Sequence, residues 1–281
     1  MISVVIPAHN EAAVINRSLQ ALLAGANPDE IEVVVVSNGS TDDTANIARR
    51  FSPIVRVIET DVASKTNALN LGDAVVQSFP RIYLDADVVI TFDAARALAR
   101  RLANGDVHAV APIPAIDVSG CAPQVRAYYA IRSKLPSARE GLGGSGVYAL
   151  SAAGRARFGK FPDITADDAY VRLHFSPTER ATMPSVVSRV YAPRTLGSLI
   201  AIRTRIYHGI AELARRFPEI MANAGVSNNR SLIALLQRPR LWPALATYLY
   251  VNTMARYLAY SRPYQKSFKW THDQSSRSQT A

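Results

Sequence analysis

The sequence predicts an α/β fold with a mostly parallel central sheet, flanking helices and a helical C-terminal segment. Short apolar runs rich in Val and Ile alternate with helical patterns through the first hundred residues. These runs lack polar–apolar alternation, which is typical of parallel strands covered on both faces. The chain has 281 residues, of which 48% are hydrophobic, so it is long enough to bury one large core.

The first half is expected to hold four strand–helix pairs. β-branched residues identify the strands, and apolar residues at helical spacing identify the helices. Asn27 and Pro28 end the first helix, and Ser40, three residues before Asp43, is expected to cap the second. We expect strands at 3–7, 31–36, 55–59 and 81–84, and helices at 11–24, 40–51, 65–78 and 93–102.

The second half is less regular. Residues 107–112 are a further candidate strand, and 141–151 combine a glycine-rich loop with an apolar run. Residues 163–168 form an acidic turn that leads into a helix. After Ser185 the sequence predicts mostly helix. We therefore expect one domain at 1–195, followed by a helical extension at 196–270 and a flexible tail at 271–281.

Charge and cysteine content limit the class of protein. The net charge of +10 favours anionic partners such as nucleic acid, an acidic lipid surface or phosphorylated substrates. The single cysteine, Cys121, excludes an internal disulfide and a cysteine-cluster zinc site, and it suits a reducing compartment.

Residues 241–260 are apolar but are interrupted by Pro243, Asn252 and Arg256. This pattern predicts a helix that is buried against the domain or lies flat on a membrane.

Three polar clusters follow expected strands, at 7–10, 37–39 and 85–87. Ligands of parallel sheets bind beyond the carboxyl ends of the strands, so we expect these clusters to share one site. Asp85 and Asp87 can share a hard divalent cation with a diphosphate, although such a pair is as easily a capped turn. The sequence lacks the glycine-rich motifs of dinucleotide-binding proteins, P-loop proteins and α/β-hydrolases.

Other charged residues have both a functional and a simple structural interpretation. Lys65, near an expected helix start, can reach a phosphate or remain a surface lysine. Asp167 and Asp168 can supply a general base or favourable charge at a helix N-terminus. Arg203 and Arg205 can bind phosphate through their planar guanidinium groups or lie on a solvated helix face.

Seven motifs resemble, in order and spacing, those of family 2 glycosyltransferases. They are VVIPAHNE (4–11), SNGSTDDT (37–44), KTNALNLG (65–72), DADV (85–88), GGSG (143–146), TADD (165–168) and RTRIYHG (203–209). The resemblance covers residues 1–209 and implies the GT-A fold, a nucleotide-sugar donor, a divalent cation (Mn²⁺ or Mg²⁺) and inverting transfer. It also divides the expected catalytic domain, 1–195, into a nucleotide-sugar half over about 1–110 and an acceptor half over about 111–195.

The resemblance implies a role for each matching residue. Asp168 would be the catalytic base and Asp87 the metal ligand. Gly144, Ser145 and Asp167 would border the acceptor. The nucleotide-sugar would be bound by Pro7, Ala8, Asn10, Glu11, Asn38, Lys65, Asp85, Ala86, Arg203 and Arg205.

Two departures from the family pattern refine the expectation. The resemblance implies UDP as the donor nucleotide, but Asn38 replaces a frequent aspartate that reads the base, which leaves the base specificity open. Ile202 and Ile206 stand where the family often has glutamine and tryptophan, which favours transfer of a single sugar over polymerisation.

We therefore expect a metal-dependent hexosyltransferase that acts on a glycan or lipid-linked acceptor in the synthesis of cell-surface glycans or glycolipids. It would be cytoplasmic and peripheral on the inner face of the membrane, with no nucleic-acid partner. The membrane contact would use an aromatic and basic set of residues, Trp242, Tyr248, Tyr250, Tyr257, Tyr260 and Arg262.

Two alternatives stay open. A sugar-phosphate nucleotidyltransferase shares the α/β nucleotide-binding architecture, but it should carry a glycine-rich, lysine-bearing N-terminal loop, which residues 7–10 do not provide. A non-enzymatic basic protein that docks on a membrane would explain the net charge but leaves Asp85, Asp87 and Asp168 without a role.

Overall fold

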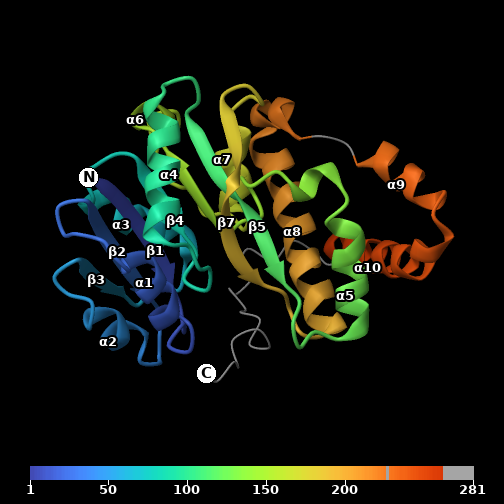
Figure 1. The fold of residues 1–281 in the computed structure, drawn as a ribbon, viewed down its shortest axis with the longest axis horizontal. Helices are drawn as coiled ribbons and strands as arrows, with labels where there is room; N and C mark the ends of the chain where they lie inside the picture. Colours follow the sequence, from blue (N-terminus) through green and yellow to red (C-terminus); the bar gives the residue numbers. More distant parts are fainter. Residues whose placement is uncertain (226–227, 262–281) are drawn as a thin grey trace.

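A seven-stranded sheet forms the centre of the computed structural model, which describes residues 1–225 and 228–261 (Figure 1). The strands lie in the order β3-β2-β1-β4-β6-β5-β7, and every pair is parallel except those that β6 makes with β4 and β5. The predicted α/β fold with a mostly parallel sheet is therefore confirmed. The strands are β1 (Ile2–Ala8), β2 (Ile31–Asn38), β3 (Val55–Thr60), β4 (Arg81–Leu84), β5 (Ala109–Asp117), β6 (Val147–Leu150) and β7 (Arg180–Tyr191).

The N-terminal half of the sheet is covered on both faces. Val4 and Ile6 of β1 belong to the hydrophobic core beneath helices α1 and α4, whereas Val5 between them belongs to the core beneath α3. Continuous burial of β1 and β2 explains their unbroken apolar runs. The helices of this half are α1 (Ile15–Leu23), α2 (Thr44–Arg49), α3 (Lys65–Val75) and α4 (Phe92–Ala103).

Two expected helix starts are wrong. Ser40 does not cap α2, which begins at Thr44; its Oγ instead accepts a hydrogen bond of 3.2 Å from the backbone N–H of Asn10. The first helix begins at Ile15 instead of residue 11, because the chain first turns through Glu11, whose carbonyl accepts from Val14 and Ile15. In both places, residues expected to begin a helix instead form hydrogen bonds within the loops before it.

The second half adds an edge to the sheet and a helical cluster. Its helices are α5 (Pro123–Arg132), α6 (Ala152–Arg155), α7 (Asp167–Leu173), α8 (Leu196–Arg216), α9 (Asn229–Leu236) and α10 (Trp242–Ser261). Short 3-10 turns, η1 (Pro136–Ala138), η2 (Pro218–Asn223) and η3 (Pro239–Leu241), lie between some of them. Helices α5, α8 and α10 pack against one another beside β5 and β7 (Figure 1).

The prediction of mostly helix after Ser185 is wrong as far as Tyr191. β7 continues through this region because it pairs with β5 along its whole length, across an irregularity between Pro112 and Ile113. Val186 and Ser188 are buried while Val187 and Arg189 are exposed, which is the alternation of an edge strand.

Helix α10 packs one face inward, with Leu245, Tyr248, Val251, Asn252 and Ala255 buried. No helix in residues 1–225 and 228–261 is long and apolar enough to cross a membrane. The expected flexible tail at 271–281 and Arg262 lie outside the described residues.

Candidate active site

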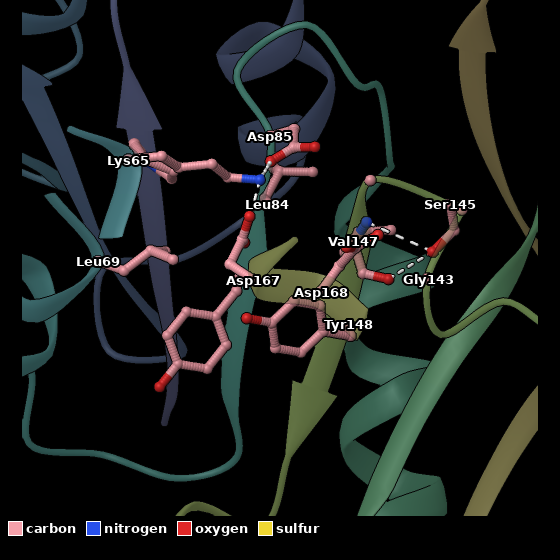
Figure 2. A pocket seen from close by; sticks show the side chains of 14 residues that line it. Lys65, Leu69, Leu84, Asp85, Gly143, Ser145, Val147, Tyr148, Asp167 and Asp168 are labelled. Atoms are coloured by element: carbon pink, nitrogen blue, oxygen red, sulfur yellow. Dashed lines mark hydrogen bonds and ion pairs between the residues drawn. The ribbon is translucent and has the colours of Figure 1, made fainter. Parts of the chain in front are cut away.

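A pocket opens at the carboxyl ends of the central strands (Figure 2). Of the three polar clusters, 7–10 and 85–87 each contribute a lining residue and 37–39 contributes none. It is lined by the end of β1, the start of α3, the end of β4, the glycine-rich loop before β6, and the start of α7. The lining residues are Pro7, Lys65, Leu69, Tyr83, Leu84, Asp85, Gly143, Gly144, Ser145, Gly146, Val147, Tyr148, Asp167 and Asp168.

Lys65 is the charged centre of the pocket. Its Nζ lies 2.8 Å from Oδ1 of Asp85 and 3.1 Å from Oδ2 of Asp167, so one ammonium joins the end of β4 to the start of α7 (Figure 2). Ser64 fixes its position at the first residue of α3, because the Ser64 side chain accepts from the N–H of Asn67 as an N-cap. Burial lowers the pKa of Lys65, but Asp167, Asp85 and Asp168 outweigh it and raise the pKa well above its ordinary value.

Asp167 is the buried member of the acidic pair, with its side chain 7% exposed. Burial and the neighbouring carboxylates of Asp168 and Asp85 raise its pKa to about 6, against the opposing effect of Lys65. The pKa of Asp167 rises because removal from water disfavours its carboxylate more than the single ammonium favours it.

Asp168 faces the glycine-rich loop. A Cβ atom placed on Gly143 would stand 4.0 Å from Oδ2 of Asp168, so the carboxylate reaches the loop without a side chain between them. Oδ1 of Asp168 accepts a hydrogen bond of 2.7 Å from the N–H of Ala169. One carboxylate oxygen therefore bonds to the start of α7 and the other lies at the pocket.

The glycine-rich loop has a backbone that requires glycine. Gly143 and Gly146 have φ values of +94° and +65°, and a Cβ on Gly146 would stand 2.4 Å from Cγ2 of Val88. Ser145 holds the turn from inside, since its Oγ lies 2.7 Å from the carbonyl oxygen of Gly141 and 2.6 Å from that of Val147. Ser145 lines the pocket, and its hydroxyl is engaged in hydrogen bonds within the loop.

The loops after β1 and β2 are tied together next to the pocket. Asn38 is fully buried, and its Nδ2 donates to the carbonyl of Ala8 at 2.8 Å. Asn10 adopts a φ of +53° and accepts through Oδ1 from the N–H of Thr41 at 2.8 Å. Of the residues expected in these loops, Pro7 lines the pocket, whereas Ala8, Asn10, Glu11 and Asn38 are not among its lining residues.

The expected metal ligand Asp87 and its neighbour Ala86 follow β4 outside the pocket lining. Asp87 is half-buried and Ala86 is buried. Among the residues that the structure describes, no group of three or more His, Cys, Asp or Glu is arranged to hold a metal ion by itself.

Helix α8 packs against the acidic segment through Gly209. A Cβ on Gly209 would stand 2.7 Å from Cβ of Ala166, and Glu212 accepts from the N–H of Thr165 at 3.0 Å. Arg205 lies one turn before Gly209 on the same face of α8, and its side chain makes no hydrogen bond or ion pair in the described part of the chain.

Arg203 points elsewhere. Its guanidinium stacks 4.9 Å from the ring centre of Tyr207, and its Nη2 donates to Oδ1 of Asn252 on α10 at 3.3 Å. The structure therefore brings Lys65, Asp85, Asp167, Asp168, Gly144 and Ser145 together, and places Arg203 in the contact between α8 and α10.

Tyr148 is a pocket residue that the sequence did not single out. Its ring stacks on that of Tyr83 at 5.0 Å between centres, and its hydroxyl is buried without a hydrogen-bond partner within residues 1–225 and 228–261. Burial raises its pKa well above the ordinary value. The sequence signal that could have identified Tyr148 is its position in the apolar run directly after the glycine-rich loop.

Comparison with known proteins agrees with this geometry. Residues 3–150 match the model of glycosyl transferase family 2. The chain is 34% identical over 101 residues to the probable glycosyltransferase YdaM of Bacillus subtilis (strain 168), and this alignment covers 33% of the chain and 22% of YdaM. The chain therefore spans well under half of that relative's length.

Solved structures share the fold. The mannosyltransferase PcManGT of Pyrobaculum calidifontis, determined with GDP-Man and Mn²⁺, superposes with a TM-score of 0.64 at 21% identity, covering 93% of this chain and 88% of that one. Glucosyl-3-phosphoglycerate synthase of Mycobacterium tuberculosis, determined with Mn²⁺, UDP and glucosyl-3-phosphoglycerate, gives a TM-score of 0.57 at 22% identity, covering 77% and 79%.

Proposed function

This chain belongs to glycosyl transferase family 2, and on that premise we propose that it moves a sugar from a nucleoside-diphosphate donor to an acceptor hydroxyl with inversion at the anomeric carbon. The observation that carries the proposal is the arrangement of Lys65, Asp85, Asp167 and Asp168 around one pocket at the carboxyl ends of the strands. Such an arrangement supplies both a binding site for the donor and a base.

Asp168 is the base. It takes the proton of the acceptor hydroxyl, and that oxygen attacks the anomeric carbon from the face opposite the leaving diphosphate. Asp167 is the less suitable residue for this role, because it is buried and bound to Lys65. Asp168 lies next to it and faces the Gly143 turn, where an acceptor can approach.

The charge of the pocket supports a divalent cation. Its lining holds one ammonium, Lys65, against the three carboxylates Asp85, Asp167 and Asp168. A diphosphate would be repelled by this excess of negative charge unless a cation accompanies it. Mn²⁺ and Mg²⁺ accept one or two carboxylates together with phosphate oxygens, so Asp87, with Asp85, fits this mode of binding. The cation would supply charge neutralisation on the leaving diphosphate.

Arg205 supplies further positive charge for the diphosphate. It makes no ion pair or hydrogen bond within the described residues and lies on the face of α8 that packs against the acidic segment. Arg203 instead joins α8 to α10 through Asn252. The proposal therefore assigns the diphosphate contact to Arg205 and a structural role to Arg203.

A panel of nucleotide-sugars tests the proposed function. We expect release of a nucleoside diphosphate from at least one UDP- or GDP-sugar in the presence of Mn²⁺, with UDP as the first choice. Binding of the free nucleoside diphosphate, measured by calorimetry, should require Mn²⁺. No binding and no release from any member of the panel would contradict the proposal.

We also propose that α9 and α10 rest on an anionic membrane surface, which brings a glycan or lipid-linked acceptor to the site. Helix α10 exposes Trp242, Leu249, Tyr250, Tyr257 and Tyr260 on the side opposite its buried stripe. Between Glu219 and Asp273 the sequence holds no acidic residue but seven Arg or Lys. Exposed aromatic side chains among arginines suit the interface of anionic lipids.

Vesicle co-sedimentation tests the membrane proposal. The protein should bind vesicles of phosphatidylglycerol and phosphatidylcholine more than vesicles of phosphatidylcholine alone. The variant Trp242→Ser/Tyr257→Ser should lose this binding. Tyr191→Ser is the matched control. It removes a tyrosine of β7, not of α10, whose ring centre lies 4.1 Å from the guanidinium carbon of Arg17. Equal binding to both vesicles, or binding unchanged in the double variant, would contradict it.

A further inference from the structure

A second charged region lies beside the pocket, behind the turn of Gly143 and Gly144. Arg172 of α7 follows Asp168 by four residues and so shares its helix face. A Cβ on Gly143 would stand 3.3 Å from Nε of Arg172, and a Cβ on Gly144 would stand 3.8 Å from Nη2 of Arg132, the last residue of α5. Two guanidinium groups therefore meet two consecutive residues of the acceptor-side loop.

Arg172 is buried without adequate partners. Its side chain is 13% exposed, and its nearest carboxylate, Glu140, lies 3.8 Å from Nη1, which has no hydrogen-bond partner in the part of the chain that the structure describes. A guanidinium carries five N–H donors, and leaving them unsatisfied in a buried place is costly.

Glu140 is also not available to Arg172 alone. Arg180 lies 3.4 Å from the other oxygen of Glu140, while its own Nη1 donates to backbone carbonyls of Arg172 and Phe175. Arg180 is thus occupied with holding α7 in place. One carboxylate is shared by two arginines, and this leaves a net positive charge next to Asp168.

Arg132 adds to this charge. It is half-buried at the end of α5, and its side chain makes no hydrogen bond or ion pair among residues 1–225 and 228–261. The region of Arg132, Arg172 and Arg180 therefore carries three positive charges, against the carboxylate of Glu140 and that of Asp168 on the same side of Gly143.

From this geometry we infer that the acceptor carries an oxyanion, a phosphate or carboxylate, which Arg172 and Arg132 bind across the turn of Gly143 and Gly144 while its hydroxyl faces Asp168. This inference rests on the proposed glycosyl transfer. Planar guanidinium groups bind both oxyanions through paired hydrogen bonds. Nε of Arg172 faces Gly143 and is the atom that an acceptor at this turn would reach, whereas Nη1 lies at Glu140.

Gly144 provides independent support. Unlike Gly143, its backbone does not lie in the left-handed region, and a Cβ would meet nothing closer than Arg132 at 3.8 Å. Neither backbone conformation nor packing therefore requires glycine at this position. Glycine here keeps Nη2 of Arg132 uncovered, so that a ligand lying against the loop can reach it.

The test uses the full chain saturated with Mn²⁺ and the nucleoside diphosphate that it binds. Glycerol 3-phosphate, glycerate and glycerol are titrated by calorimetry, and farnesyl phosphate and farnesol are compared in the same way to separate a soluble from a lipid source. We expect at least one acid to bind at least tenfold more tightly than its neutral counterpart. Arg172→Gln and Arg132→Gln should each reduce that affinity about tenfold, as expected for loss of a charge-assisted contact.

Two further variants sharpen the result. Arg126→Gln changes an exposed arginine on α5 and should leave acid binding within twofold of the unaltered chain. Gly144→Val should block acid binding without loss of folding, which covers the case in which Arg172→Gln does not fold. Equal affinity for acids and neutral alcohols, or acid binding unchanged in both arginine variants, would overturn the inference.

The two proposals fail in different ways. If the chain binds the nucleoside diphosphate with Mn²⁺ and releases it from a nucleotide-sugar, but no acid binds, only the acceptor inference is wrong. If neither binding nor release of the nucleoside diphosphate is observed, the proposed function itself is wrong.

Discussion

Replacing Lys65 by methionine tests the electrostatic account of the pocket. The substitution keeps most of the apolar stem but removes the ammonium that lies 2.8 Å from Asp85 and 3.1 Å from Asp167. Three carboxylates then remain in the pocket lining without a countercharge. The expected result is a loss of stability that depends on pH.

The two ion pairs contribute unequally. Asp85 has a side chain 37% exposed, so its pair with Lys65 is screened by solvent and is worth about 1 kcal/mol or less. Asp167 is 7% exposed, and stranding a buried charge of this kind costs about 3–5 kcal/mol. Relief of the desolvation of Lys65 offsets part of this loss, so we expect the free energy of unfolding to fall by about 3 kcal/mol at pH 7.5.

The sign of the pH dependence follows from Asp167. Its pKa in the folded protein is raised to about 6, so its stabilising contribution is complete below the unfolded value and is lost as the pH rises through 6. At pH 5 Asp167 is mostly protonated in both proteins, and the variant then loses only the screened pair with Asp85. The destabilisation should therefore shrink to about 1 kcal/mol at pH 5.

Urea unfolding at pH 5 and pH 7.5, followed by circular dichroism, measures both values. Lys160→Met, which changes an exposed lysine, is the matched control and should have little effect at either pH. The double variant Lys65→Met/Asp167→Asn should recover stability relative to Lys65→Met alone at pH 7.5. A loss that is the same at both pH values, or no recovery in the double variant, would refute the reasoning.

Three other predictions concern the catalytic roles and the packing of α8. Asp168→Asn should lower turnover, measured by steady-state kinetics, about 10²–10⁴-fold. Its affinity for the nucleoside diphosphate, measured by calorimetry, should stay within twofold of that of the unaltered chain. Near-normal turnover would remove Asp168 from the base role. Asp87→Asn, or EDTA with the unaltered chain, should abolish the gain in diphosphate affinity that Mn²⁺ provides, and a gain retained in the variant would exclude Asp87 as a ligand. Gly209→Ala should lower Tm, because the new Cβ would stand 2.7 Å from Cβ of Ala166. Gly197→Ala in the same helix should raise Tm, because its Cβ meets nothing closer than 4.0 Å and alanine favours the helix. The reverse order of Tm values would contradict the packing described.

The strands of the nucleotide half could be predicted because their cause is local. Continuous runs of Val and Ile at 31–36 are buried on both faces and allow one interpretation. β7 lacks such a run. Pro184 and the exposed side chains of Val187 and Arg189 interrupt its apolar pattern, and only pairing with β5 establishes it as a strand.

The site could be predicted in part for the same reason. Lys65 and Asp85 follow local signals, a helix start and a strand end, and both line the pocket. Their contact with Asp167 depends on how α7 packs against the sheet, which no local pattern determines. Arg203 and Arg205 are two residues apart, and side chains so spaced on a helix point about 200° apart. The packing of Gly209 on Ala166 decides which of them faces the acidic segment.

In the proposed reaction, Asp168 deprotonates an acceptor for transfer from a nucleotide-sugar held in this pocket. The most direct measurement is the rate at which the full chain, with Mn²⁺, releases nucleoside diphosphate from a panel of UDP- and GDP-sugars, compared with the rate for Asp168→Asn. The account predicts release from at least one donor and its loss by about 10²-fold or more in the variant. No release from any donor, or equal release by the two proteins, would contradict it.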